Sequence, residues 1–344
     1  MGPLRIDLGA EDLWPLFISP DSQRLFARSW PHGTLKVCSL QAADVPEVIE
    51  DRDRAIRDAA LLGANRLAVL LEGGRVKFSD LTTYETVDSL EFEVGADRLA
   101  CSSDGNRMAI GPGSNAQIAV FNLCTREKIQ ELNGLEHGCN FTRISFSPDG
   151  RYIIAIGDYR LGVWDQQGTL VAQFYSGGQR LKMDMAVTPD GTKLIWIDYM
   201  GSDDESGSSC CVRVLDLESN EKVKLWELAS QNNALRALDI SHDGRRVIAG
   251  GKFAPYWEAR KQGRAPEAVC EWPLDAPDGF IRDDRSFHTH TIGEVQGDIL
   301  FARLAPDGSK IVAFALELIA SGSDFVYTGN RFITVWDYPR HHLL

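Results

Sequence analysis

The sequence predicts an all-β protein built from a repeated unit of four antiparallel strands. Three observations carry this prediction. A turn phrase close to Ser-Pro-Asp-Gly recurs along the chain, apolar β-type runs flank its copies, and a third run follows that ends on a similar dipeptide. Self-similarity at a roughly fixed period is the signature of a repeat architecture.

The turn phrase occurs seven times, once as a degenerate copy. Its copies are Ser19-Pro20-Asp21-Ser22, Gly63-Ala64-Asn65-Arg66, Ser103-Asp104-Gly105, Ser147-Pro148-Asp149-Gly150, Thr188-Pro189-Asp190-Gly191, Ser241-His242-Asp243-Gly244 and Ala305-Pro306-Asp307-Gly308. The Asp or Asn positions lie 44, 39, 45, 41, 53 and 64 residues apart. The first four spacings are near the roughly 40–45 residues of a propeller blade. Proline presets φ, aspartate bonds its own backbone two residues on, and glycine accepts a positive φ, so each copy predicts a hairpin turn.

The run before a turn, such as Arg143-Ile144-Ser145-Phe146, and the run after it, such as Tyr152 to Ile156, are typical of paired strands. The third runs end on Val163-Trp164-Asp165, Val335-Trp336-Asp337, Val214-Leu215-Asp216 and Val120-Phe121-Asn122. This pattern resembles the WD40 family over essentially the whole chain. Only Trp164-Asp165 and Trp336-Asp337 match the family's dipeptide literally, blade two has Ser79-Asp80, and the family's Gly-His pair is missing.

The resemblance implies a seven-bladed β-propeller of four-stranded antiparallel blades, in a single domain over 1–344. The blades are expected at about 9–51, 52–93, 94–134, 135–176, 177–230, 231–293 and 294–340. The last repeat supplies only three strands, and an exposed edge favours aggregation. We therefore expect the N-terminal strand, residues 3–8, to close the last blade; a frayed terminus is the alternative.

Composition limits the function. The chain of 344 residues has a formal net charge of −13, which disfavours nucleic acid and anionic membranes as partners. Seven cysteines without a C-x-x-C pair, no signal peptide and no apolar run of membrane-spanning length predict an intracellular protein, cytoplasmic or nuclear. No cofactor is expected.

Three insertions interrupt the step from the second to the third strand in blades five, six and seven. They are 199–209, 251–266 and 317–330. Antiparallel order places all three on one face, here called the top face, opposite the Pro-Asp-Gly turns. Aromatic and arginine residues dominate interface hot spots, so the predicted partner-binding residues are Tyr256, Trp257, Arg260, Phe325 and Tyr327. Alternatively, the aromatics pin their own loops and the acidic blade-five insertion is a solvated spacer.

The inner strands contain charged residues at positions where burial of an apolar residue would cost less free energy. These channel candidates are Arg98, Arg143, Asp184, Asp239 and Arg303. They form either a site or pairs between neighbouring blades, and Asp184 with Asp239 could hold a divalent cation. His288-Thr289-His290 resembles a metal element but also fits a solvated outer strand. No metal site is predicted.

The favoured function is a non-enzymatic scaffold or adaptor that binds other proteins or peptides through the top-face loops of blades five to seven. The sequence contains no nucleophile elbow, no phosphate loop and no H-E-x-x-H motif, so no catalytic residue is predicted. The alternative is a small-molecule enzyme, a lyase, isomerase or hydrolase, with its ligand at the top of the channel. A reader of modified peptides is a third hypothesis.

Overall fold

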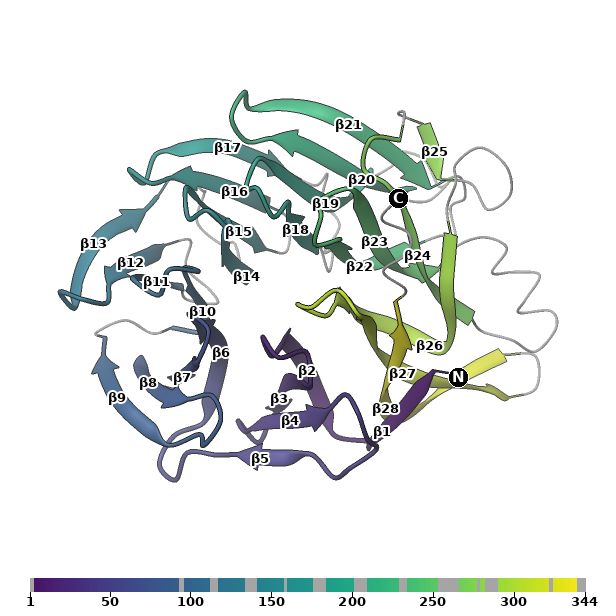
Figure 1. Ribbon diagram of the computed structural model, residues 1–344, viewed down its shortest axis with the longest axis horizontal. Helices are drawn as coiled ribbons and strands as arrows, with labels where there is room; N and C mark the ends of the chain where they lie inside the picture. Colours follow the sequence, from purple (N-terminus) through teal and green to yellow (C-terminus); the bar gives the residue numbers. More distant parts are fainter. Residues whose placement is uncertain are drawn as a thin grey trace. The chain divides into compact units, whose positions relative to one another are not determined.

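The computed structural model describes residues 3–92, 96–111, 117–133, 141–157, 160–175, 184–200, 209–228, 234–252, 266–276, 279–281, 290–321 and 324–338 (Figure 1). Every regular element in these ranges is a β-strand. The described residues contain no helix that could cross a lipid bilayer. Among the described strands, four sheets are four-stranded and antiparallel, as in propeller blades, and the other two contain five and seven strands, with one parallel pair between Glu221–Leu228 and Gly279–Ile281. This all-β arrangement confirms the predicted fold class.

The chain divides into two compact units. One unit contains Phe26–Val37 and Glu47–Lys182, and the other contains Met1–Leu25, Cys38–Pro46 and Met183–Leu344. The first blade has the strand order β2-β3-β4-β5. These strands are β2 (Asp12–Ile18), β3 (Arg24–Trp30), β4 (Leu35–Ser39) and β5 (Glu47–Ile49).

The unit built around residues 47–182 holds three complete blades. The second blade is β6 (Ile56–Leu62), β7 (Arg66–Leu71), β8 (Arg75–Asp80) and β9 (Thr86–Glu91). The third is β10 (Arg98–Cys101), β11 (Arg107–Gly111), β12 (Ile118–Asn122) and β13 (Glu127–Leu132). The fourth is β14 (Phe141–Phe146), β15 (Tyr152–Gly157), β16 (Arg160–Asp165) and β17 (Leu170–Tyr175). Each blade keeps its strands in chain order, as a simple meander does.

The other unit holds the remaining strands, which form two sheets. The fifth blade is β18 (Met185–Val187), β19 (Lys193–Met200), β20 (Ser209–Asp216) and β21 (Glu221–Leu228), extended by β25 (Gly279–Ile281). The second sheet contains β22 (Ala234–Ile240), β23 (Arg246–Lys252), β24 (Pro266–Pro273), β26 (His290–Leu304), β27 (Lys310–Ser321), β28 (Asp324–Asp337) and β1 (Leu4–Gly9).

The predicted turns form with nearly the same bonds in six blades. In the fourth blade, the Gly150 N–H donates to the Ser147 carbonyl at 2.8 Å, and the Asp149 carboxylate accepts from Ser147 Oγ at 2.6 Å and from the Arg151 N–H at 3.0 Å. Gly150 has φ +70°, which glycine adopts without steric cost. Local turn chemistry therefore fixes each inner hairpin.

The N-terminal strand completes the last blade, as expected. β1 pairs antiparallel with β28 over the register Leu4↔Val335 to Gly9↔Arg331 (Figure 1). Ile6 is buried on this strand, and Arg5 lies 3.9 Å above the Phe332 ring. The edge of β28 next to β1 is thereby covered.

The sixth and seventh blades are joined by one long strand. β26 first pairs with β24 as the outer strand of the sixth blade, and then with β27 as the inner strand of the seventh. Glycines permit this passage, because a Cβ at Gly297 would lie 2.1 Å from the Leu316 carbonyl oxygen and one at Gly293 would lie 2.2 Å from Trp336 Nε1. The two blades are consequently one curled sheet.

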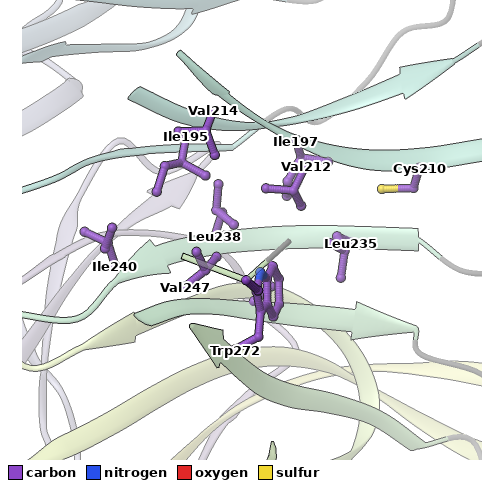
Figure 2. Close-up of a cluster of buried hydrophobic side chains, with 12 residues drawn as sticks. Ile195, Ile197, Cys210, Val212, Val214, Leu235, Leu238, Ile240, Val247 and Trp272 are labelled. Carbon is purple, nitrogen blue, oxygen red and sulfur yellow. The ribbon is translucent and has the colours of Figure 1, made fainter. Parts of the chain in front are cut away.

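The apolar core lies between neighbouring blades. In Figure 2, Ile195, Ile197 and Val212 from the fifth blade face Leu238 and Trp272 from the sixth. Trp272 is 1% exposed. Each such side chain contributes about 1.5–3 kcal/mol by leaving water, so packing between blades is a main source of stability.

Candidate functional site

The third insertion is a β-hairpin, which corrects the expectation of a loop over 317–330. β27 runs to Ser321 and β28 begins at Asp324, with register pairs Leu318↔Tyr327 and Ile319↔Val326. The segment contains β-branched and aromatic residues, among them Ile319, Val326 and Tyr327, which suit a pleated pair of strands. The pairing extends the seventh blade beyond Arg331, where its contact with β1 ends.

This hairpin, residues 318–327, presents apolar side chains to solvent. Ile319 and Val326 are directly opposite each other across the two strands and are 49% and 44% exposed. Opposed residues share one face of a strand pair, so together they form an apolar patch on the hairpin. Leu318 and Tyr327 occupy the opposite face, where Leu318 is buried.

The base of the hairpin is tied to a buried polar cluster. Tyr327 is 58% exposed, yet its hydroxyl donates a hydrogen bond to the Asp298 carboxylate on β26. Arg236 on β22 lies 2.5 Å from the same carboxylate and 3.8 Å from that of Glu267 on β24. Glu267 is fully buried and accepts the Ile299 N–H at 2.6 Å. The cluster therefore joins β22, β24, β26 and β28.

The charges of this cluster shift its acid–base equilibria. Burial and then the hydrogen bond to Asp298 together raise the pKa of the Tyr327 phenol from 10.0 to about 12. Burial opposes the charge of Arg236, but the carboxylates of Glu267 and Asp298 outweigh this effect and raise the pKa of its guanidinium. Tyr327 thus stays a hydrogen-bond donor, and Arg236 stays a cation.

The other predicted partner-binding residues lie partly outside the described residues. Tyr256, Trp257 and Arg260 lie outside the described residues. Phe325 lies on β28 opposite Ala320, and only its backbone is described. Of the metal-like segment, His288 lies outside the described residues and His290 begins β26. The described residues contain no group of three His, Cys, Asp or Glu side chains suited to a metal ion.

Three of the predicted channel residues come together in the unit that contains residues 183–344. The Asp184 carboxylate forms a two-pronged pair with Arg303, with N–O distances of 2.8 Å for both prongs. Asp184 also accepts the Leu238 N–H of β22 at 2.9 Å, and Asp239 accepts the Leu304 N–H of β26 at 2.7 Å. These carboxylates tie each inner strand to the next.

Burial raises the pKa of Asp239, although the nearby charge of Arg303 acts in the opposite direction. For Arg303, burial lowers the pKa, but the charges of Asp184 and Asp239 overcome that effect and raise it. The resulting arrangement is a paired, hydrogen-bonded tie. Such charges stay buried because each has partners.

The remaining channel residues, Arg98 and Arg143, lie in the other unit. Arg98 on β10 donates to the carbonyls of Thr142 and Asp97 at 2.9 and 2.7 Å. Arg143 lies on β14 opposite Ile156. A buried carboxylate that the sequence prediction missed, Asp58 on β6, accepts the Leu99 N–H at 2.9 Å. It repeats the tie that Asp239 makes.

Sequence reasoning also missed Arg236, Glu267 and Asp298. A signal was present in β24, where Glu267 and Glu271 interrupt an apolar run four residues apart and so share one face of the strand. Both are fully buried, and Glu271 pairs with Arg246 at 2.9 Å and accepts a hydrogen bond from the Tyr338 hydroxyl. Buried carboxylates within a strand predict polar partners from neighbouring strands.

Comparisons with known proteins agree with the blade architecture. The family model "WD domain, G-beta repeat" matches residues 127–165. Human WD repeat-containing protein 36 is 24% identical over 176 residues, which is 49% of this chain and 19% of that protein. Human apoptotic protease-activating factor 1 is 31% identical over 111 residues, which is 32% of this chain and 8% of that protein. The chain thus spans a fifth or less of the length of these relatives.

A solved structure supports the fold alone. Hydrazine synthase of Kuenenia stuttgartiensis superposes with a TM-score of 0.62 at 15% identity, covering 90% of this chain and 93% of that one. The recurring turns, the four-stranded sheets and the matching repeat agree with the sequence resemblance. The chain is a WD40-like β-propeller, and its sheets are consistent with seven blades.

Proposed function

We propose that this chain is a protein–protein interaction scaffold that binds partners through the top-face extensions of its fifth to seventh blades. Proteins with WD40 repeats generally mediate protein interactions, and the relatives above carry such repeats. Fold alone is a weak argument for function, so the proposed binding surface must rest on the residues of the site. The observation that carries it is the exposed hairpin 318–327.

The hairpin has the properties of a preorganised contact surface. Its apolar pair, Ile319 and Val326, is exposed on a strand pair that hydrogen bonds hold in register. The Tyr327 ring is presented to solvent while its hydroxyl is fixed by Asp298. Little side-chain freedom would be lost on binding, and this favours affinity. The residues Tyr256, Trp257, Arg260 and Phe325 are proposed to add to the same partner surface.

The channel-enzyme alternative gains no support from the described residues. Asp184, Asp239 and Arg303 bond to one another or to backbone groups of neighbouring strands, as structural ties do. A catalytic carboxylate needs an open side toward a substrate. These contacts favour a scaffold function over an enzyme with its site in the channel.

Affinity capture from cells of the source organism tests this proposal. We expect the double variant Ile319→Ser/Val326→Ser to lose a defined set of proteins that the wild type retains. The matched control is Val48→Ser/Val87→Ser, because these valines are also exposed, at 53% and 61%, but lie on outer strands β5 and β9. Equal loss in both variants, or no loss in the hairpin variant, contradicts the assignment of this surface.

A further inference from the structure

A second cluster of residues lies in the unit that contains residues 26–37 and 47–182. Its members are Arg28 at the end of β3, Arg57 on β6, Arg98 on β10 and the exposed indole of Trp30. Two of these arginines, Arg28 and Arg57, lie beside the exposed indole ring, in a chain whose net charge is −13. Arginine beside tryptophan is a combination that recognition sites favour.

Trp30 ends β3 and lies next to a turn that packs against the start of β6. Its side chain is 47% exposed, while the guanidinium carbons of Arg28 and Arg57 each lie 6.0 Å from the ring centroid. The Gly33 carbonyl of this turn accepts the Ile56 N–H at 2.7 Å. Gly33 has φ +63°, and a Cβ there would lie 2.5 Å from the Ala55 Cβ, so only glycine allows this close contact with β6.

The charges of Arg28 and Arg98 are bonded to backbone groups. Arg28 donates to the Arg57 carbonyl, and Arg98 donates to the carbonyls of Thr142 and Asp97. Among the described residues, neither guanidinium forms an ion pair with a carboxylate, and the buried Arg28 Nε has no hydrogen-bond acceptor. Two partly buried cations therefore retain capacity to bind an anion.

Asp58 is a buried carboxylate near these cations, but its printed hydrogen bonds are to backbone groups. Its carboxylate accepts the backbone N–H groups of Leu99 and Ala59 at 2.9 and 3.0 Å. Burial raises the pKa of Asp58, although Arg98 and Arg28 act in the opposite direction. Burial lowers the pKa of Arg28; the carboxylates of Asp58 and Asp97 raise it, and the positive charges of Arg98 and Arg57 lower it. The net effect is a lowered pKa, so an added anion beside Arg28 would favour its charged form.

The chemistry favours a carboxylate ligand. Guanidinium groups bind planar carboxylates through paired N–H donors. Arg57 already holds the carboxylate of Glu72, whose side chain is 57% exposed, in an ion pair beside Trp30. The net charge of −13 opposes binding of a long polyanion such as nucleic acid. A short acidic segment with an apolar neighbour for the indole fits this combination.

We propose that Arg28, Arg57, Arg98 and Trp30 form a binding site for the carboxylate side chains of an acidic peptide segment in a partner protein. The guanidiniums of Arg28 and Arg98 hold the carboxylates, and the Trp30 ring packs against the adjoining peptide. This site is separate in its residues from the hairpin 318–327. It can therefore succeed or fail independently of the scaffold surface proposed above.

Fluorescence anisotropy of the full chain with a fluorescein-labelled peptide of alternating glutamate and alanine tests the proposal at low ionic strength. We expect saturable binding that the matching glutamine peptide lacks. Arg28→Gln and Arg98→Gln should each weaken binding about tenfold or more, and Trp30→Ala should weaken it by less. The control Arg126→Gln removes the same charge from an exposed arginine that pairs with Asp88 at 2.8 Å, and it should leave binding nearly unchanged.

Two further measurements keep the test decisive. Arg28→Lys and Arg98→Lys retain the charge, so they should fold and bind more tightly than the glutamine variants but less tightly than the wild type. The hairpin variant Ile319→Ser/Val326→Ser should bind the peptide like the wild type. Equal binding of the glutamine peptide, equal weakening by Arg126→Gln, or displacement of the peptide by inorganic phosphate at equal concentration would overturn the carboxylate site.

Discussion

The guanidinium of Arg303 forms an ion pair with the carboxylate of Asp184 through two N–O contacts of 2.8 Å, although the two residues are 119 positions apart in the chain. Arg303 also donates to the Leu238 carbonyl at 2.6 Å. One side chain thus connects the inner strand of the seventh blade with residues of the fifth and sixth. Two of the charged residues predicted to line the channel, Asp184 and Arg303, therefore bond neighbouring strands to one another.

Loss of this tie should destabilise the fold strongly. Arg303→Gln leaves Asp184 and the buried Asp239 without their cation, so we expect the free energy of unfolding to fall by about 3–5 kcal/mol. Arg126→Gln, which breaks an exposed pair with Asp88, should cost about 0–1 kcal/mol. Urea denaturation of both variants measures the difference, and equal costs would show that the Arg303 pair is not a structural tie.

The continuous strand β26 should depend on Gly297. A Cβ at this position would lie 2.1 Å from the backbone oxygen of Leu316, so Gly297→Ala must shift the strands apart. We expect a loss of about 1–3 kcal/mol in thermal or chemical unfolding. Gly111→Ala is the control, because its Cβ would meet the flexible end of the Ile144 side chain. A larger cost at Gly111 than at Gly297 contradicts this account of the joined blades.

Asp190, one of the turn aspartates, should make the free energy of unfolding depend on pH in the acidic range. The pKa of Asp190 is lowered from 3.8 to about 2, chiefly by the hydrogen bond from Thr188 Oγ1 and then by that from the Thr192 N–H. A lowered folded-state pKa stabilises the fold above pH 3.8, and this contribution disappears as the pH falls through about 2. The stability gap between the wild type and Asp190→Asn should therefore shrink between pH 4 and pH 2. Urea titrations across this range test it, and a constant gap would refute the proposed bond.

Tyr327 should make the stability of the fold depend on pH in the alkaline range. Its pKa is raised from 10.0 to about 12, so its contribution to stability is complete below pH 10 and is lost as the pH rises through about 12. Tyr327→Phe lacks this titration. The stability gap between the wild type and this variant should narrow from pH 9 to pH 12, as measured by alkaline denaturation. A gap that widens over this range would rule out the bond to Asp298.

The sequence predicts the repeated hairpins because their determinants are local. Ser147, Asp149 and Gly150 contain the whole chemistry of their turn, so the fold class follows from the repeat. The closing strand was also predictable, because the last repeat lacks a strand that residues 3–8 can supply. Both predictions depend on short-range patterns and counting.

Features that depend on contacts between distant segments could not be predicted in this way. The 317–330 insertion is predicted as a loop although its pairing is local, because no copy of the repeated turn phrase lies between Ile319 and Val326. The joined blades depend on the closeness of Gly297 to Leu316. The cluster of Arg28 and Arg98 brings together two strands that are far apart in the sequence, and only Arg98 stands on an inner strand.

Hydrogen exchange of the chain, with and without a purified partner recovered by affinity capture, tests the scaffold surface most directly. The account predicts that bound partner slows exchange of backbone amides in residues 318–328. The outer strands β9 and β13 should exchange at the same rate in both states. Protection confined to those outer strands, with no change in the hairpin, would contradict the proposal that the seventh-blade extension binds partners.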